Sequence, residues 1–288
     1  MGGCIKFAAS NGIRSGMGFN IESFRNCYAM VTGASQGLGR CYAIELARSG
    51  INTLLVALPG SGLEGVVSES RSYGVDCIPF ELDLCDEKAV KELCEEVNSR
   101  YNVFLLVNNA GTGGTKCFST CTTEYIRNML TLNIIVPTML TRLLIQNLRK
   151  APRAFILNVS SMAAFSPVGF KTVYPASKRF VLHFSRGLRE ELRKDGISVS
   201  VVTPGPMKTN PDVVRRINRQ GIFGRFGLLS PEQVARISLK RTFRRTAVIL
   251  PGISNKVNHL LMTIIPDSIL IRLMSNVISR ELDSNAVL

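Results

Sequence analysis

The chain reads Thr32-Gly33-Ala34-Ser35-Gln36-Gly37-Leu38-Gly39 between an apolar, β-branched run, Tyr28–Thr32, and an amphipathic stretch, Gly37–Ser49. Three glycines at a strand-to-helix junction are typical of a dinucleotide-binding turn. Gly33 permits the tight turn, Gly37 lets a pyrophosphate approach the backbone, and Gly39 lets the helix pack close to the sheet. The N-terminus of that helix would then face the phosphates. The spacing is TGxxxGxG and not GxGxxG, and by itself it leaves open a purely structural glycine loop.

Beyond this turn, short apolar runs alternate with amphipathic stretches along most of the chain. Such alternation predicts repeated βαβ units, with a parallel sheet covered by helices on both faces. We therefore predict an α/β, Rossmann-type doubly wound parallel sheet. The expected strands are Tyr28–Thr32, Ile51–Ala57, Val75–Glu81, Val103–Val107, Ala154–Val159, Ile197–Val202 and Ala247–Leu250. The expected helices are Gly37–Ser49, a short one after Gly62, Glu87–Ser99, Glu124–Leu148, Pro175–Lys194 and Pro231–Arg245.

No Pro/Ser-rich linker interrupts this alternation, so a single domain is expected over residues 27–252. Residues 1–26 form an N-terminal leader without the continuous apolar run of a signal peptide. Residues 253–288 form an apolar C-terminal extension, interrupted by Pro266, that predicts two short helices. Its apolar residues fall at helical spacing: Leu260, Leu261, Ile264, Ile265, Ile269, Leu270, Leu273, Met274, Val277 and Ile278.

Composition excludes several classes of protein. With 288 residues, 45% hydrophobic and 19% charged, the chain is too apolar for intrinsic disorder. A fold of this size buries roughly three quarters of its extended-chain surface. The formal net charge of +14 suggests an anionic partner, such as a phosphorylated cofactor, an acyl carrier or a membrane surface. No basic cluster interleaved with aromatic residues is present, so nucleic acid is not an expected partner.

Cysteine and histidine usage bears on compartment and metals. The eight cysteines form no CxxC pair, and only two histidines are present. We therefore expect neither a disulfide framework nor a metal site, and a reducing, cytoplasmic location. No run of about 18 uninterrupted apolar residues occurs, so a transmembrane helix is not expected.

Tyr174 and Lys178 are the strongest candidates for chemistry. They lie four residues apart, so on a helix they share one face. A free tyrosine has a pKa of about 10 and is a poor acid or base at neutral pH. A nearby ammonium favours the tyrosinate and lowers that pKa, which suits proton transfer to a carbonyl oxygen. A lone YxxxK pattern also arises by chance in helices.

Taken in order, these segments resemble the short-chain dehydrogenase/reductase family. The resemblance runs from about Tyr28 to Gly252, with each motif placed as in the family. It rests on TGxxxGxG, then Asn108-Asn109-Ala110-Gly111, Leu132-Asn133-Ile134, Asn158-Val159-Ser160-Ser161, Tyr174-Pro175-Ala176-Ser177-Lys178 and Pro204-Gly205. The stretch from Ser160 to Leu192 is similar to a bacterial branch of the family, to hydroxysteroid dehydrogenases and to long-chain ketoacyl reductases.

The resemblance implies a role for each matching residue. Tyr174 would be the proton donor, and Lys178 would tune it and hold the nicotinamide ribose. Ser161 would polarise the substrate carbonyl, with Ser160 as the neighbouring alternative, and Asn133 would hold a water that relays protons to Lys178. The implied cofactor-binding residues are Gly33, Ser35, Gln36, Gly37, Leu38, Gly39, Arg40, Asp83, Leu84, Asn109, Ala110, Gly111, Tyr174, Lys178, Pro204, Gly205 and Thr209.

The charge after the second strand bears on the choice of cofactor. A site for NAD usually places Asp or Glu there to bind the ribose 2′-hydroxyl. Here Val56–Gly62 contains no acid, and Arg40 and Ser61 could bind a 2′-phosphate. The usual arginine at the strand end is missing. We predict that NADP(H) is preferred and that NAD(H) remains possible.

The substrate is expected to be lipophilic, because the segments around Ser161 and after Pro204 are rich in apolar residues. We predict an oxidoreductase that interconverts a ketone and a secondary alcohol. A reductase of 3-oxoacyl groups on acyl carrier protein or CoA is an alternative, and a catalytically idle, dinucleotide-binding sensor is an alternative of another class. Such a sensor would be expected to lack Ser161, Tyr174 or Lys178, and all three are present.

Two further expectations concern oligomerisation and the role of the C-terminal extension. Glu124–Leu148 and Pro175–Lys194 carry a second apolar set, which predicts a homodimer or homotetramer. The set comprises Leu143, Leu144, Ile145, Phe180, Leu182 and Phe184. Each helix of the C-terminal extension is too short to span a bilayer but could lie on one, so peripheral membrane contact is an alternative to capping the substrate pocket.

Overall fold

The computed structural model describes residues 24, 26–208, 213–215, 219 and 227–282. The predicted leader therefore lies almost entirely outside the described residues, as does Thr209. The described part folds around one seven-stranded sheet, in the order β3-β2-β1-β4-β5-β6-β7, with every pair of neighbours parallel. The strands are β1 (Cys27–Thr32), β2 (Asn52–Ala57), β3 (Cys77–Glu81), β4 (Asn102–Asn108), β5 (Ala154–Val159), β6 (Ile197–Val202) and β7 (Val248–Ile249). The predicted doubly wound, Rossmann-type sheet is confirmed.

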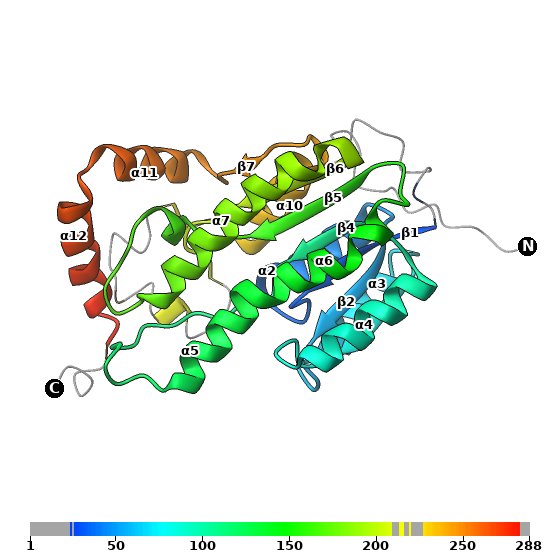
Figure 1. Cartoon of the computed structure of the whole chain (residues 1–288), viewed down its shortest axis with the longest axis horizontal. Coiled ribbons are helices and arrows are strands. Elements are labelled where there is room, and N and C mark those ends of the chain that lie inside the picture. Colours follow the sequence, from blue (N-terminus) through cyan, green and yellow to red (C-terminus); the bar gives the residue numbers. More distant parts are fainter. Residues whose placement is uncertain (1–23, 25, 209–212, 216–218, 220–226, 283–288) are drawn as a thin grey trace, which may run out of the picture.

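Helices cover both faces of this sheet (Figure 1). One face carries α2 (Gly37–Arg48), α3 (Leu63–Arg71) and α10 (Pro231–Phe243). The other carries α4 (Glu87–Arg100), α6 (Val136–Leu148) and α7 (Val173–Glu191). The strand order reverses between β1 and β4, and in such sheets the ligand crevice lies at the carboxyl ends of the strands at that point.

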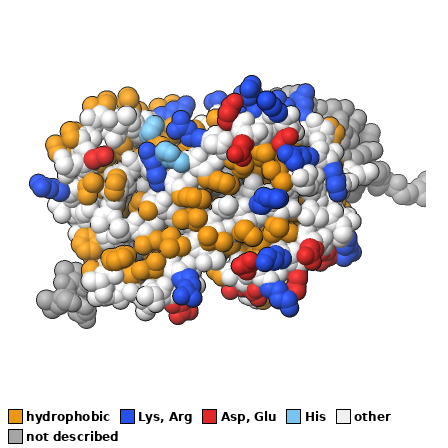
Figure 2. Space-filling view, in the orientation of Figure 1, with side chains coloured by type: hydrophobic (Ala, Val, Ile, Leu, Met, Phe, Trp, Pro, Cys, Tyr) orange, Lys and Arg blue, Asp and Glu red, His pale blue; other side chains and the backbone are white. Residues whose placement is uncertain are grey.

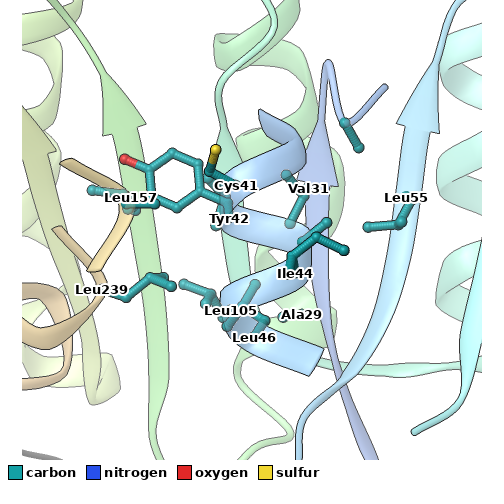
Figure 3. Close-up of a cluster of buried hydrophobic side chains, with 14 of the residues drawn as sticks. Ala29, Val31, Cys41, Tyr42, Ile44, Leu46, Leu55, Leu105, Leu157 and Leu239 are labelled. Atoms are coloured by element: carbon teal, nitrogen blue, oxygen red, sulfur yellow. The ribbon is translucent and has the colours of Figure 1, made fainter. Parts of the chain in front are cut away.

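The core beneath α2 shows why this helix lies where it does (Figure 3). Tyr42, Ile44 and Leu46 of α2 are buried, and they pack in one cluster with Leu55 of β2 and Leu239 of α10. Side chains from little more than one turn of α2 thus pack against a strand, β2, and a second helix, α10. This packing fixes the position of the glycine turn at the start of α2.

The predicted long helix Glu124–Leu148 is interrupted. It consists of α5 (Thr123–Leu130), a π-helical turn, η2 (Thr131–Ile135), and α6. Single π turns are rare in proteins as a whole, and those that occur often lie at functional sites. The turn in this protein contains Asn133, so the side chain implicated by the sequence sits at the irregular point of the helix.

By length and composition alone, Thr123–Leu148 is also apolar enough to cross a membrane. Within the molecule, however, this helix packs against β4 and β5, and its side chains Val136, Leu140 and Leu144 are buried in the core. We interpret it as a core helix with one exposed apolar face.

After β7, the C-terminal extension forms α11 (Ile253–Ile264) and α12 (Asp267–Ser279), the two predicted helices. They lie at one end of the molecule, and α12 runs toward the loop that precedes α5 (Figure 1). Short 3₁₀ turns also occur among the described residues, including η3 (Met162–Phe165) after β5 and η4 (Leu192–Asp195) after α7.

Gly39→Ala tests the close contact between α2 and β1. A Cβ at position 39 would lie 1.9 Å from the Gly33 carbonyl oxygen, a backbone atom that cannot move aside. We expect the free energy of unfolding to fall by about 3 kcal/mol. Gly65→Ala in α3 is the matched control, because a Cβ there meets nothing within 4 Å. It should raise that free energy by about 0.5 kcal/mol. Urea unfolding of both variants checks this, and equal stabilities would contradict the packing argument.

Candidate active site

The glycine turn is held by hydrogen bonds from the segment that follows β4. Gly33 has φ of 65° and Gly37 of 55°, values that suit glycine. The Asn109 side chain donates to the Thr32 carbonyl at 2.9 Å and to the Gly33 carbonyl at 3.3 Å. The Thr32 hydroxyl accepts from the backbone N–H groups of Asn109 and Ala110, both at 3.0 Å. The start of α2 is thus fixed to the end of β4.

A cavity of about 490 Å³ opens beside this turn. Its volume is in the range of small-molecule sites, and the N-terminus of α2 favours phosphate there. The residues present therefore fit the phosphate-bearing part of a dinucleotide. The lining residues are Gly37, Arg40, Cys41, Lys208, Leu228, Leu229, Ser230, Pro231 and Glu232.

The side chain of Arg40 is already engaged. It forms an ion pair with Glu69 of α3 and is 44% exposed. No acid lies within Val56–Gly62 after β2, but α3 places the Glu69 carboxylate beside Arg40. Among the other predicted cofactor residues, Gln36 is exposed just before α2, Ser35 is half-buried and Leu38 lies in the core. Asp83 is exposed beside the buried Leu84, and its carboxylate accepts from the Cys85 N–H at 2.8 Å.

The predicted catalytic residues gather around the segment 111–113. Lys178 is buried in α7, and its Nζ lies 5.8 Å from the centre of the Tyr174 ring. A Cβ placed on Gly111 would lie 3.0 Å from Asn133 Oδ1 and 3.2 Å from Lys178 Nζ. A Cβ on Gly113 would lie 2.8 Å from the Tyr174 ring. The backbone therefore passes the predicted catalytic side chains so closely that residues 111 and 113 have no room for side chains of their own.

Asn133 is bound to this segment through both atoms of its amide. Its Oδ1 accepts from the Thr112 N–H, and its Nδ2 donates to the Thr112 carbonyl, each at 2.9 Å. The Nδ2 also donates to the Ser177 hydroxyl at 3.0 Å, and that hydroxyl donates to the Tyr174 carbonyl at 2.8 Å. Ser177 and Thr112 were not identified from the sequence. For Ser177 a signal existed, since it lies within Tyr174–Lys178 and faces the same way as Tyr174.

Ser160 and Ser161 occupy different environments. The buried Ser160 hydroxyl donates to the Lys178 carbonyl at 2.6 Å, so it joins β5 to α7. Ser161 is only half-buried, and its hydroxyl accepts from the Ala163 N–H at 3.2 Å at the start of η3. Its own proton is therefore not used in that bond. This geometry favours Ser161 as the hydroxyl that meets a substrate, as the interval to Tyr174 predicts.

The electrostatics of Lys178 are set by its burial. Loss of solvation lowers the pKa of its amine from 10.5 to about 8. The Nζ donates to the Val159 carbonyl at the end of β5, at 3.1 Å. An amine with a pKa near 8 exchanges protons readily around neutral pH, as a proton-relay group requires.

The last predicted segment, Pro204-Gly205, lies after β6. The Pro204 carbonyl accepts from the Met162 N–H at 2.9 Å, which ties this turn to η3. Asn255 of α11 packs against it so closely that a Cβ on Gly205 would lie 2.4 Å from Asn255 Oδ1. The C-terminal extension thus reaches the predicted cofactor segment, a contact that no sequence pattern indicated.

A glycine turn at the strand-order reversal, joined through residues 109–113 to a Tyr-Lys pair on α7, defines a nucleotide-dependent oxidoreductase of the α/β class. Comparison with known proteins gives the family. Residues 28–220 match the family described as short chain dehydrogenase. The chain belongs to this family, as the sequence motifs predicted.

Similar proteins extend the comparison. The chain is 32% identical over 188 residues to a very-long-chain 3-oxoacyl-CoA reductase of Anas platyrhynchos, covering 62% of this chain and 58% of that protein. It is 31% identical over 185 residues to 17-beta-hydroxysteroid dehydrogenase type 3 of Mus musculus, covering 63% of this chain and 60% of that protein. The match therefore spans less than two thirds of the length of these two relatives.

A solved structure matches over more of its length. A short-chain dehydrogenase from Sphingobium yanoikuyae, in complex with NADPH, has a TM-score of 0.71 and 26% identity. The match covers 84% of this chain and 97% of that one. The expected likeness to hydroxysteroid dehydrogenases and ketoacyl reductases is confirmed by the two relatives, and the fold by this structure.

The lowered pKa of Lys178 predicts a pH-dependent stability. Between pH 8 and 10.5 the unfolded chain holds this proton more tightly than the folded one, so the free energy of unfolding rises with pH across that window. Lys178→Met should abolish this rise and should be more stable than the parent at pH 7, by up to about 3 kcal/mol. Urea unfolding of both proteins from pH 7 to 10.5 measures it, since other titrating groups cancel in the difference. Parallel curves for the two proteins would refute the burial argument.

Proposed function

We propose that this chain is an NADP(H)-dependent oxidoreductase that interconverts a ketone and a secondary alcohol on a lipophilic substrate. One observation carries the proposal: Tyr174, Lys178 and Asn133 converge on segment 111–113, which follows directly from the residues that hold the glycine turn. Proton-transfer groups therefore sit beside the predicted dinucleotide site.

The residues divide the chemistry as follows. A bound nicotinamide dinucleotide supplies or accepts the hydride. Tyr174 gives a proton to the substrate oxygen during reduction and takes it back during oxidation. The Ser161 hydroxyl donates a hydrogen bond to the same oxygen and polarises the carbonyl. Lys178, with its pKa near 8, replaces the proton on Tyr174 and holds the nicotinamide ribose.

The cofactor is held by the elements around the cavity at α2. Gly33, Gly37 and the N-terminus of α2 would bind the phosphates, and Asp83 and Asn109 the adenosine part. The absence of an acid from Val56–Gly62 and the presence of Arg40 and Lys208 at the cavity favour a 2′-phosphate. The NADPH complex of the related dehydrogenase supports the same preference. The pairing of Arg40 with Glu69 leaves NAD(H) as the alternative.

The substrate class rests on apolar surroundings and on the relatives. Met162, Ala164 and Val168, which follow Ser161, are buried apolar residues. The similar proteins are named for very-long-chain 3-oxoacyl-CoA and for a 17-beta-hydroxysteroid, both lipophilic. Reduction of 3-oxoacyl thioesters on CoA or acyl carrier protein is the alternative substrate. A dinucleotide-binding sensor without turnover is the alternative of another class.

Turnover with matched variants tests the proposal. The protein should reduce a long-chain or polycyclic ketone with NADPH, followed by nicotinamide absorbance, and faster than with NADH. Tyr174→Phe should abolish turnover while NADPH binding, followed by fluorescence, stays within about twofold. Ser161→Ala should lower kcat by about a hundredfold with little change in stability. Ser160→Ala is the control, because it should lower stability through its lost bond to α7. Near-normal turnover of Tyr174→Phe would exclude the mechanism.

We also propose that the chain forms a homodimer or homotetramer through α5, η2, α6 and α7. Figure 2 shows hydrophobic side chains gathered over this face. Leu130, Ile135 and Phe180 are exposed, and Phe180 stacks on Phe184 at 5.8 Å. Leu144 and Leu182, which the sequence assigned to this surface, are instead buried within the subunit core.

We further propose that the protein is cytoplasmic and binds a membrane peripherally through the surface of α11 and α12. Large apolar side chains project from α11 and α12, and Figure 2 shows them along the outer edge of the molecule. Residues 253–280 include three basic residues, Lys256, Arg272 and Arg280, and one acidic residue, Asp267. An apolar face flanked by basic residues fits an anionic lipid surface. The exposed side chains are Ile253, Val257, Leu260, Leu261, Ile264, Ile269 and Leu273.

Point variants test this surface without removing the extension. Leu260 and Ile264 are 59% and 68% exposed, so replacing both by Ser should leave the fold intact. The parent should co-sediment with phosphatidylcholine vesicles that contain phosphatidylserine, and high salt should release it. The double variant should lose most of this binding, whereas Leu130→Ser with Ile135→Ser should keep it and weaken the oligomer in light scattering. If the α11 variant changes only the oligomer, a second copy of the chain covers that face and the membrane proposal fails.

A further inference from the structure

Glu281 is a carboxylate buried just beyond the end of α12. Its side chain is 0% exposed, and acidic residues are almost never fully buried unless they are paired. Its Oε1 accepts from Lys171 Nζ at 2.8 Å, and its other oxygen accepts from the Thr115 hydroxyl. A buried carboxylate is tolerated only when such bonds replace its lost hydration. The C-terminal extension therefore has a specific polar attachment.

The two partners of Glu281 belong to two loops, one between β4 and α5 and the other directly before α7. Lys171 precedes α7, and its carbonyl accepts from the Tyr174 N–H at 3.0 Å. Thr115 lies three residues after Thr112, the residue bound to Asn133. The loops are also joined directly, because the Lys116 N–H donates to the Phe170 carbonyl at 2.8 Å. One carboxylate thus connects both loops to the C-terminal extension.

The segment between these bonds is strained. Phe170 has φ of 61°, in the left-handed region that non-glycine residues rarely adopt. Such a conformation persists only where neighbouring contacts impose it. On one side of Phe170, the Gly169 N–H donates to the Ser275 hydroxyl of α12 at 2.8 Å. On the other side, Lys171 pairs with Glu281, so residues 275 and 281 bracket the strained residue.

This junction forms part of a wall beside Tyr174. A small cavity of about 20 Å³, close to the volume one water needs, lies between the loops. Gly114 and Lys116 line it from the loop after β4, and Phe170, Lys171 and Tyr174 line it from the other loop. The loops therefore have little space to shift before they alter the surroundings of the Tyr174 ring.

We propose that Glu281 is a positioning residue for substrate. It holds Gly169–Lys171 against Gly114–Lys116 and so keeps one wall of the carbonyl site in place beside Tyr174. The proposal rests on the proposed function for its substrate, a ketone. Its consequence is specificity: bulky ketones, which reach the wall, depend on Glu281, whereas small ketones, which need only Tyr174 and Ser161, do not.

Kinetics on two ketones test the proposal. Glu281→Gln keeps the shape of the side chain but removes its charge, and Lys171→Met removes the partner. Each should lower kcat/KM for a bulky ketone by about tenfold to a hundredfold, chiefly through KM, because misplacement of about 1 Å has effects of this size. For a small ketone the change should stay within about twofold. The exchanged pair, Lys171→Glu with Glu281→Lys, should restore part of the loss. Glu96→Gln, in the exposed pair with Arg100, is the control and should change neither ketone.

Amide hydrogen exchange gives a readout that needs no turnover. In Glu281→Gln the amides of Gly169 and Lys116 should exchange faster, while those of β4 and β5 keep the parental rate. Uniform acceleration throughout, or equal kinetic losses on both ketones, would show a general loss of stability and overturn the proposal. Unchanged exchange and kinetics would overturn it too. If the parent reduces no ketone, the proposed function fails, and exchange still decides whether Glu281 holds the two loops.

Discussion

Helix α2 meets the end of β1 at a distance that tolerates no side chain at position 39. The contact is made possible by Gly39, and Asn109 fixes it from the neighbouring strand by donating to the Thr32 and Gly33 carbonyls. Because Asn109 directly follows β4, the same bonds set where the next residues, Ala110 to Thr112, leave the sheet. Thr112 then donates its N–H to the Asn133 side chain. Asn133 donates to the Ser177 hydroxyl, and that hydroxyl donates to the Tyr174 carbonyl. The predicted cofactor turn and the predicted proton donor are therefore parts of one hydrogen-bonded path.

The path explains why so many residues along it are small. Gly111 and Gly113 lie where any Cβ would contact Asn133, Lys178 or the Tyr174 ring. Lys178 in turn is buried against the end of β5, and this burial lowers the pKa of its amine to about 8. The close packing that excludes side chains thus also lowers the basicity of the Lys178 amine to a range that suits proton exchange near neutral pH.

The fold was predictable from the sequence because its signals are local. Apolar runs and glycines at strand ends act within a few residues, and most element boundaries agree to within two residues. The π turn at Asn133 was not predictable, since one extra residue in a turn barely alters a helical pattern. Likewise, the pairing of Arg40 with Glu69 was not predictable, because it depends on the packing of α3 beside α2. Glu281 contacts Lys171, which lies 110 positions before it in the sequence, and Thr115, which lies 166 positions before it. No pattern within one element can indicate contacts over such a sequence separation.

Glu281 lies well beyond residue 220, where the match to the family ends. On the ribosome, every strand of the sheet and every predicted catalytic residue is made before this carboxylate. The hydrogen-bonded path from Thr32 to Tyr174 therefore lies in segments synthesised early, whereas Ser275 and Glu281, which bracket the left-handed Phe170, are synthesised later. The predicted proton-transfer residues and the proposed positioning residue, Glu281, thus lie in separate stretches of the gene. Under the role proposed for Glu281, substitution in the later stretch should change which ketones the site accepts and leave the proton-transfer residues intact.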